Sequence, residues 1–477
     1  MHSNVPKVLH PLRGLPLIEH ALRIAQSVTH TRPIIVVGHE ADDVRSVIGT
    51  RADFVLQAEQ LGTGHAVMQA ETVLQPDGTA AGEGISHYLI LAADMPLVRP
   101  HSLERLVERR VQTGAAIAML TVVVDNPRGF GRVVRDAAGH VKAIVEQVAC
   151  TPDQLAIREL NSSIYCMDAE WMWGALKRIR PNPQKGEYFL TDLVEIANQD
   201  KRMVIAEVGD DPDELIGVNT RADLADADAA LRRRINHAHM LAGVSIEDPL
   251  STYIDLDVIL APDVTILPNT HLLGHTRIET GCTVGPNTVL RDTVVGRHCE
   301  ICQSTAEGAQ VDDDADVGPY SHLRAGAHVG RGAHVGNFGE IKKSTLGPRS
   351  KMGHFGYLGD ATVGESVNIG AGTITCNYDG TNKHPTNIGD EAFIGSDTLL
   401  VAPIKIGARA STAAGAVVIR DVPPDTLVAG VPAREIQHHG ASSHAQDHEG
   451  GAVGTSAKDP GFEDTGRRDP GSPATDE

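Results

Sequence analysis

The most constraining feature of this chain is an apolar residue that returns every six positions through its second half. Six residues match neither the 3.6-residue helical period nor the two-residue alternation of a strand. They match the hexapeptide repeat of a parallel β-helix, in which each hexad supplies one short strand of a triangular coil and turns one side chain inward. The repeat occupies three runs: Leu260, Ile266, Leu272, Ile278, Val284 and Leu290; Val311, Val317, Leu323, Val329, Val335 and Ile341; and Ile388, Ile394, Leu400 and Ile406, with Val418 two steps on.

We therefore expect residues 243–436 to form a left-handed parallel β-helix, because coils built on this repeat generally have that hand, against the right-handed rule for other parallel crossovers. The low aromatic content of 3% suits a core of Val, Ile and Ala. Enzymes of this shape are very often acyltransferases.

Length and composition limit the classes of function. A chain of 477 residues suggests two or more domains. Its net charge of −20 argues against nucleic acid or an anionic membrane as partner. We expect no membrane span, since no apolar run is long enough, and no signal peptide at Met1–Asn4. Six cysteines show no disulfide framework, and Cys299–Cys302 is interpreted as two reduced thiols rather than a zinc or redox motif. We expect a cytoplasmic protein.

Residues 1–220 alternate β-rich and helical segments, which predicts an α/β (Rossmann-like) domain with a mostly parallel sheet. Residues 221–242 predict a linker helix whose basic triplet, Arg232–Arg234, lies on its solvated face. Residues 437–477, with four histidines, predict a disordered tail rather than a metal site. The expected strands are 33–38, 54–56, 87–91 and 116–124, and the expected helices are 17–28 and 103–111.

Three features of the first half are candidates for ligand binding or catalysis. Asp94 ends a predicted strand, where ligands bind in open α/β sheets and a carboxylate can hold Mg²⁺, although such an Asp can equally cap a helix. The Gly-rich turn 57–65 can approach a base or an anion, or be only a tight βα loop. Lys7 can contact a phosphate or be a surface charge.

Seven segments of the first half occur in the order seen in sugar nucleotidyltransferases, ahead of the solenoid. With them, the chain resembles the bifunctional bacterial enzymes that join an N-acetylglucosamine-1-phosphate uridyltransferase to a glucosamine-1-phosphate acetyltransferase. The resemblance covers residues 1 to about 435 and is most specific at 332–380, which contains NIGAGTITCNYDG at 368–380. The seven segments are Val5–His10, Gln57–His65, Leu91–Pro96, Gly129–Arg132, Ile144–Glu146, Lys185–Asp192 and Gly217–Asn219.

For the first domain, the resemblance implies uridylyl transfer from UTP to N-acetylglucosamine-1-phosphate, with Mg²⁺ held by Asp94 and Asn219. Such a reaction requires positioning and charge neutralisation rather than a covalent nucleophile. The implied contacts to UTP are Lys7, Gln57, Gly62 and Thr63, and those to the sugar are Gly131, Glu146, Asn161 and Asn219.

For the solenoid, acetyl transfer to an amine requires a base for the ammonium proton, cations for the substrate phosphate and donors for the thioester oxyanion. His354 fits the base. Arg324 and Lys342, on consecutive stretches of coil, can pair with a phosphate. The resemblance adds Tyr357, Asn368 and Lys383 for glucosamine-1-phosphate, and Ala371, Asn377, Tyr378, Ser396 and Ala414 for acetyl-CoA.

Residues 377–385 break the hexad register and are rich in turn residues, so we expect an extruded loop. In this solenoid class such loops reach a neighbouring subunit, and the resemblance implies a homotrimer with acetyltransferase sites between chains. A rival zinc site at His322, His328 and His334 is disfavoured. These histidines are six apart and should diverge on successive faces, whereas vertical stacking requires eighteen residues.

The chain departs from the family pattern in four places. Where the family has Glu-x-Lys-Asp, residues 146–149 read Glu-Gln-Val-Ala, so the basic contact of that Lys is absent. An Arg that is usual near the end of the coils is replaced within residues 429–432, which read Ala-Gly-Val-Pro. Gly356 stands where Thr is usual. The family also opens with a strand and a Gly-rich loop, whereas six residues precede Lys7 here, so we expect weak uridylyl transfer.

The predicted function is thus acetylation of glucosamine-1-phosphate from acetyl-CoA, followed by uridylylation, in the synthesis of UDP-N-acetylglucosamine for peptidoglycan precursors. One alternative is an acetyltransferase with an impaired first domain. Another is a non-catalytic trimeric scaffold that binds sugar nucleotides, against which His354, Arg324 and Lys342 argue together.

Overall fold

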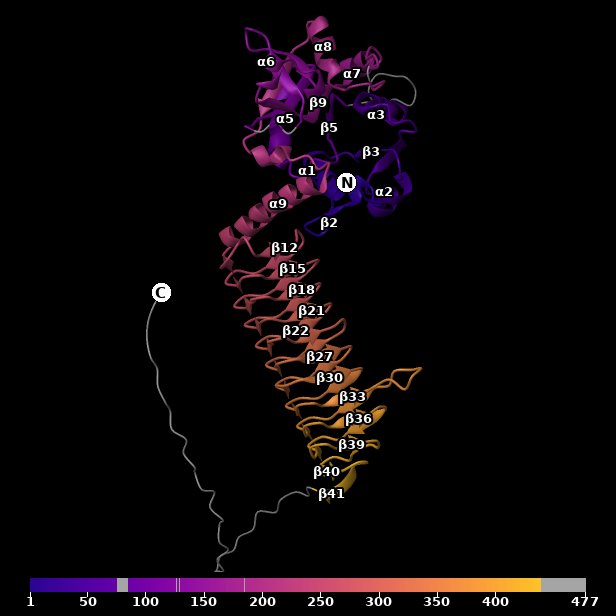
Figure 1. Ribbon diagram of the computed structural model, residues 1–477, viewed down its shortest axis with the longest axis vertical. Coiled ribbons are helices and arrows are strands. Elements are labelled where there is room, and N and C mark those ends of the chain that lie inside the picture. Colours follow the sequence, from indigo (N-terminus) through magenta and orange to yellow (C-terminus); the bar gives the residue numbers. More distant parts are fainter. Residues whose placement is uncertain (75–84, 126, 128, 184, 439–477) are drawn as a thin grey trace, which may run out of the picture.

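The computed structural model describes residues 1–74, 85–125, 127, 129–183 and 185–438. An α/β domain lies at one end, a long helix leaves it, and a tapering stack of coils follows (Figure 1). None of the helices in these described segments combines the length and the apolar character that a membrane span requires.

The main sheet of the first domain is mixed, with six strands in the order β10-β6-β9-β7-β8 and β5 paired to β9. Strands β6 and β10 are parallel, but β9 is antiparallel to β5, β6 and β7. The prediction of a mostly parallel sheet is therefore wrong for this half of the domain. The strands are β5 His87–Ile90, β6 Ile117–Val123, β7 Arg132–Arg135, β8 Val141–Val145, β9 Glu159–Asp168 and β10 Val204–Val208.

The helices of this domain follow from its apolar spacing and its capping residues. Helix α1 has the predicted bounds, and α5 extends the predicted segment at both ends, starting at a proline in its first turn and stopping before Gly114, whose φ of +65° suits glycine. The helices are α1 Leu17–Val28, α2 Ala41–Ile48, α3 Thr63–Gln69, α4 Glu71–Leu74, α5 Pro100–Thr113, α6 Pro152–Leu155, α7 Ala169–Leu176 and α8 Asp192–Gln199.

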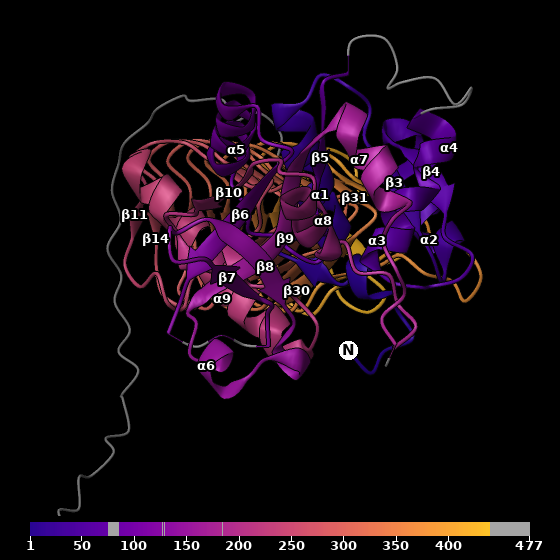
Figure 2. The same cartoon turned by 90° about the horizontal axis from the view of Figure 1, so that it is seen from above.

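Two further parallel strands, β3 (Ile34–Val37) and β4 (Asp53–Leu56), form a separate sheet. Seen from above, they lie with α2 and α3 to one side of the six-stranded sheet (Figure 2). In the described chain no backbone hydrogen bond joins β3 to β5. A cavity of about 1080 Å³ separates them instead, lined by β3, β5 and apolar side chains of α1 and α7. All residues of β5 are consequently only half-buried.

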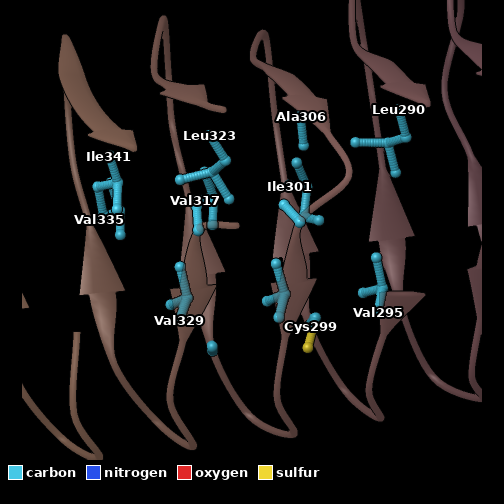
Figure 3. Close-up of a cluster of buried hydrophobic side chains, with 14 of the residues drawn as sticks. Leu290, Val295, Cys299, Ile301, Ala306, Val317, Leu323, Val329, Val335 and Ile341 are labelled. Atoms are coloured by element: carbon cyan, nitrogen blue, oxygen red, sulfur yellow. The ribbon is translucent and has the colours of Figure 1, made fainter. Parts of the chain in front are cut away.

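The predicted parallel β-helix is confirmed. Strands β11 (Ser245–Ile246) to β41 (Arg434–His438) form three sheets of twelve, ten and nine strands, and successive strands pass from one sheet to the next. The residues of the six-fold runs are all buried and stack on one another inside the coil (Figure 3). The parallel bridges pair a residue with the one a full coil later, as Leu272 pairs with Leu290, and only β40 and β41 of these described strands pair antiparallel.

Between Leu290 and Val311 the six-fold run is interrupted, but the inner column is not. Leu290 pairs with Ala306 and Ala306 with Leu323, so these coils are two and one residues shorter than the eighteen-residue coil from Leu272 to Leu290. The buried side chains Val295, Ile301 and Ala306 keep the stack continuous. Shortened corners, rather than a break in the fold, explain the gap in the sequence pattern.

Helix α9 (Arg221–Leu241) joins the two parts and covers the open end of the first coil. Its Thr220 cap accepts a hydrogen bond from the backbone N–H of Asp223 at 3.1 Å. Its buried face belongs to one continuous apolar core with the coils and with Leu12, Leu17 and Leu97 of the first domain. This packing stops the end of the solenoid from presenting unpaired strand edges to solvent.

The basic triplet on α9 is not simply a solvated face, which corrects the prediction. The guanidinium of Arg232 lies 4.6 Å from the ring centroid of Tyr253, and that of Arg13 lies 5.3 Å from it. Arg234 donates to the backbone C=O of Leu97 at 2.6 Å. Arg233 is exposed and pairs with Asp213. Arg232 therefore ties α9 to the solenoid, and Arg234 ties it to the first domain.

The predicted tail lies outside the described residues, apart from Gln437 and His438 at the end of β41.

Candidate functional site

Three residues from separate parts of the first domain meet at one point. Lys7 lies in the short 3-10 helix η1 (Lys7–Leu9), Asp94 follows β5, and Asn219 precedes α9. The Lys7 Nζ lies 2.6 Å from Asp94 Oδ2 and 3.0 Å from Asn219 Oδ1. The backbone N–H of Val218 donates to the C=O of Asp94 at 2.9 Å, which ties the two loops together. These residues are the ones predicted for a nucleotide phosphate and Mg²⁺.

The chemistry of this point fits a hard divalent cation. The carboxylate oxygen of Asp94 and the amide oxygen of Asn219 both point to the ammonium of Lys7. Both oxygens are of the ligand types that Mg²⁺ takes. Among the described residues, no group of three or more His, Cys, Asp or Glu is arranged to hold a metal. Asp94 and Asn219 would therefore supply two ligands, leaving the others to water and phosphate oxygens.

The Gly-rich turn is held by the segment that precedes α8. The Gln57 amide donates to the C=O of Gly62 at 3.1 Å, and the Thr63 hydroxyl accepts from the backbone N–H of Leu190 at 3.1 Å. Gly62 has a φ of +98°, and a Cβ there would lie 2.7 Å from the C=O of Tyr188. Only glycine fits that position, so the turn and the segment that holds it form one rigid unit.

The predicted sugar contacts also converge. Asn161, buried on β9, donates from its backbone to the C=O of Gly131 and from its amide to the Tyr165 hydroxyl at 2.7 Å. A Cβ on Gly131 would lie 3.5 Å from a carboxylate oxygen of Glu146, so the two residues are adjacent. Burial raises the pKa of the Glu146 carboxyl, opposed by the charge of Lys185.

The large cavity reaches this region. Thr63 and Glu146 line it together with the β3 and β5 residues, whereas Lys7, Asp94 and Asn219 lie outside its lining. Its volume of about 1080 Å³ exceeds the ~300–1,000 Å³ of ordinary ligand pockets. One predicted nucleotide contact, Thr63, and one predicted sugar contact, Glu146, thus border a space larger than a small ligand needs.

In the solenoid, four predicted residues occupy one corner on successive coils. The register aligns Met352, Ile369, Ile394 and Thr412 on the twelve-stranded sheet. His354, Ala371, Ser396 and Ala414 each follow these aligned positions by two residues, so the predicted base and three predicted acetyl-CoA contacts form a column. The column begins at β29 (Lys351–Met352) and continues at β32 (Asn368–Ile369), β35 (Phe393–Ile394) and β38 (Ser411–Thr412).

The imidazole of His354 is exposed at this corner. Within the described part of the chain it has no hydrogen-bond partner, so both ring nitrogens are accessible to a substrate. Asn368 projects from the twelve-stranded sheet beside Lys351 of the preceding coil.

Two cations lie at the ends of strands in the neighbouring ten-stranded sheet, and a third, Lys383, reaches them from the predicted extruded loop 377–385. Arg324 follows β24 (His322–Leu323), and Lys342 ends β27 (Gly339–Lys342) on the next coil. The charge of Lys383 and its contact with the Lys342 ammonium lower the pKa of Lys342, with a further contribution from Arg324. Arg324 pairs with Glu340 at 2.8 Å, which raises the pKa of its guanidinium. Clustered like charges of this kind suit a polyvalent anion.

Tyr357, on β30 (Gly356–Gly359), and Asn377 approach each other over Gly359. A Cβ on Gly359 would lie 2.3 Å from the Tyr357 hydroxyl oxygen and 2.7 Å from the Asn377 amide nitrogen. That amide donates to Asp360 Oδ2 at 2.6 Å. Gly359 therefore permits the approach, and Asp360 orients the Asn377 side chain.

The predicted extruded loop is present between β33 (Ile374–Cys376) and β34 (Thr386–Ile388), and it projects well away from the coils (Figure 1). Asp379 closes it: its carboxylate accepts from the backbone N–H groups of Thr381 and Asn382, at 2.8 and 2.6 Å, and lies 2.7 Å from His384 Nε2. These contacts lower the pKa of Asp379 to about 2. The loop is thus an ordered arm, and a β-bridge between Tyr378 and Lys383 joins its two sides.

The three histidines weighed for zinc lie on different faces. His322 belongs to the ten-stranded sheet, His328 to the nine-stranded sheet and His334 to the twelve-stranded sheet. Each lies against an acidic residue of the preceding coil, as His328 Nε2 does at 2.9 Å from Asp312. Their side chains therefore diverge and stabilise neighbouring coils.

Sequence reasoning missed Gly359, Asp360 and Asp192. Burial, with the charges of Glu195 and Glu146, raises the pKa of Asp192 to about 6. Asp360 precedes Asn377 by 17 residues, which is one coil. That spacing was the available signal, because a residue one coil back lies directly beside its partner.

Comparisons with known proteins address both halves of the chain. Residues 1–151 match the family model described as MobA-like NTP transferase domain. A protein of Trichlorobacter lovleyi named Bifunctional protein GlmU is 45% identical over 90% of this chain and 92% of its own length. Proteins with the same name from Streptococcus mutans and Exiguobacterium sibiricum are 43% and 41% identical, over 94% and 90% of this chain and 96% and 94% of their own lengths.

Proposed function

Because this chain belongs to the family of bifunctional GlmU proteins, we propose that it carries two transferase activities, one in each half. The left-handed β-helix transfers acetyl from acetyl-CoA to glucosamine-1-phosphate. The first domain then transfers uridylyl from UTP to the resulting N-acetylglucosamine-1-phosphate and releases pyrophosphate. The product is UDP-N-acetylglucosamine.

In the acetyl transfer, His354 accepts the proton of the substrate ammonium, so that the free amine attacks the thioester carbonyl and the CoA thiol leaves. The phosphate of the substrate binds to Arg324, Lys342 and Lys383. Tyr357 and Asn368 position the sugar. The contacts to acetyl-CoA come from Ala371, Asn377, Tyr378, Ser396 and Ala414.

The observation that carries this assignment is the meeting of Arg324, Lys342 and Lys383 in a protein whose net charge is −20. Arg324 has Glu340 as a partner, and the contact of Lys342 with Lys383 brings two like charges together, an arrangement that a bound anion stabilises. The adjacent corner supplies an exposed imidazole without a partner in the described chain. Together they provide the phosphate clamp and the base that the reaction requires.

The test of this site is CoA thiol release from acetyl-CoA and glucosamine-1-phosphate, followed with a thiol reagent. Lys342→Ala should raise the KM for glucosamine-1-phosphate at least tenfold, because one charge-assisted contact to phosphate is lost. Lys405→Ala is the matched control, since Lys405 is exposed on the nine-stranded sheet. Equal KM values in both variants would refute the phosphate clamp.

In the uridylyl transfer, the sugar phosphate attacks the α-phosphorus of UTP, and the protein neutralises charge and positions the two substrates. Lys7, Gln57, Gly62 and Thr63 bind the nucleotide, while Gly131, Glu146, Asn161 and Asn219 bind the sugar side. Asp94 and Asn219 would hold Mg²⁺, which when bound neutralises phosphate charge.

We further propose that the protein is a cytoplasmic homotrimer. The projecting loop supports this assembly, because the segment between β33 and β34 extends beyond its own coils, where a neighbouring subunit can meet it (Figure 1). Sizing chromatography with light scattering measures the stoichiometry directly. A monomer at micromolar concentration would refute the trimer.

One observation favours a second candidate, an acetyltransferase with an impaired first domain. The β3–β4 sheet is separated from β5 by the large cavity, beside the predicted nucleotide and sugar contacts. Because no backbone hydrogen bonds join β3 to β5 in the described chain, the Gly-rich turn after β4 and Asp94 after β5 are held on two sheets instead of one. Pyrophosphate release from UTP and N-acetylglucosamine-1-phosphate distinguishes the candidates: absence of release alongside full acetyl transfer would establish the second.

A further inference from the structure

The ammonium of Lys7 lies where the proposed metal ligands converge. Its Nζ is 2.6 Å from Asp94 Oδ2 and 3.0 Å from Asn219 Oδ1. The Lys7 side chain retains 37% of its exposure and that of Asp94 retains 26%, so the pair is open to solvent and to incoming ions. The other nearby cation, the Met1 ammonium, donates to the backbone C=O of Asn219 at 3.3 Å rather than to either ligand atom.

A divalent cation and this ammonium cannot use the same two oxygens together. Contact distances for Mg²⁺ are about 2.0–2.1 Å, which would bring the metal close to Nζ in its present position. Like charges a few ångströms apart repel strongly, even with the moderate screening of a protein surface. Metal binding at Asp94 and Asn219 therefore requires the ammonium to leave.

We propose that Lys7 is a resident counter-cation of this site, which holds Asp94 and Asn219 together while nucleotide is absent and is displaced by the metal. The inference rests on the proposed metal site. The displaced Lys7 ammonium is the group assigned to the nucleotide phosphates. When a metal–nucleotide complex binds, the metal takes Asp94 and Asn219 as partners, and Lys7 takes the phosphates. Lys7 consequently weakens binding of the free metal and strengthens binding of the metal–nucleotide complex.

This dual role makes two predictions of opposite sign for one substitution. Lys7→Met removes the charge and keeps an unbranched side chain of similar length. It should tighten binding of Mn²⁺ alone, used as the probe for the divalent site, by about tenfold, because the metal no longer displaces a cation. The same variant should bind UTP more weakly in the presence of Mg²⁺.

The experiment is a titration of the full 477-residue protein with Mn²⁺, with free Mn²⁺ measured by electron paramagnetic resonance. Lys177→Met is the matched control, because Lys177 forms a comparable ion pair with Glu71 at 2.8 Å in the same domain. Lys7→Arg should retain the weak Mn²⁺ binding of the parent. Adding Asp94→Asn to Lys7→Met should abolish the increase in Mn²⁺ affinity.

The outcomes separate this inference from the metal site on which it rests. Equal Mn²⁺ affinity in the parent and Lys7→Met, both sensitive to Asp94→Asn, would overturn displacement and leave the metal site standing. A similar gain in Lys177→Met would also overturn it, as an effect of net charge. If neither the parent nor Lys7→Met binds Mn²⁺, with or without UTP, both the inference and the metal site are wrong.

Discussion

At the scale of single residues, His354 is the proposed general base of the acetyl transfer. The residue stands at an exposed corner, in one column with three predicted acetyl-CoA contacts, so a substrate can reach its imidazole. We predict that His354→Ala lowers acetyl transfer by about 10²–10⁴-fold, the usual contribution of a general base. Thiol release measures the rate, and circular dichroism should show an unchanged fold because His354 is exposed. A rate within threefold of the parent would exclude the role.

Gly359 tests whether the approach of Tyr357 to Asn377 matters. An alanine there would place a methyl group 2.3 Å from the Tyr357 hydroxyl oxygen and 2.7 Å from the Asn377 amide nitrogen, so both side chains must move. We predict at least a tenfold loss of acetyl transfer, since small misplacements of positioning groups are costly. Tyr357→Phe, which removes only the hydroxyl, gives the comparison. Full activity in Gly359→Ala would show that this geometry is not used.

At the scale of elements, the extruded loop owes its order to Asp379. The pKa of that carboxyl is about 2 in the folded protein, below the value of about 3.9 for an unfolded chain. Its contacts therefore stabilise the folded loop at a pH above about 3.9, and this stabilisation is lost as the pH falls through the folded-state pKa. At neutral pH the Asp379 carboxylate is therefore ionised and makes all three contacts. Asp379→Asn should speed amide hydrogen exchange across residues 377–385 and raise the KM for acetyl-CoA. His384→Ala removes one of the three contacts and should have a smaller effect of the same sign.

If Asp379→Asn left exchange in the loop unchanged, the backbone alone would suffice to order it.

Helix α9 determines where the solenoid can be cut. Its buried residues Leu231 and Ile235 cover the first coil, and the Asn236 amide donates to the C=O groups of Pro249 and Thr252 at 2.9 and 3.1 Å. We predict that residues 221–435 form a soluble, active acetyltransferase, whereas 240–435 is less stable because the coil end is uncovered. Thermal melts by circular dichroism test the difference. Equal melting temperatures would show that the helix is dispensable.

At the scale of the whole molecule, the two halves differ in how well they are filled. The coils carry a continuous apolar column, whereas a cavity of about 1080 Å³ lies between β3 and β5. Interiors are ordinarily close-packed, and unfilled apolar volume lowers stability. The first domain should therefore unfold before the solenoid.

The two tryptophans of the chain allow this to be measured. Trp171 and Trp173 both lie on α7 of the first domain, so tryptophan fluorescence follows that domain alone. We predict that its thermal transition precedes the loss of β-sheet circular dichroism. The native protein should also enhance the fluorescence of anilinonaphthalene sulfonate, a dye that binds exposed apolar surface. Coincident transitions without dye binding would contradict this.

The sequence by itself determined the solenoid, because each face of a coil must turn one apolar side chain inward and therefore imposes a period of six. It also determined α1, the strand cores and the extruded loop, which depend on local spacing and turn residues. The candidate residues of both sites were named from motifs in the sequence.

Only the tertiary structure decided which of these residues meet. Lys7 reaches Asp94 and Asn219 across separations of 87 and 212 residues, and no local pattern records such contacts. The mixed sheet has the same cause, since strand direction in β9 is set by its neighbours and not by its own sequence. Arg232 joined the domain interface because Tyr253 lies opposite it. Local periodicity reports the surroundings of one segment, whereas a site depends on contacts between segments.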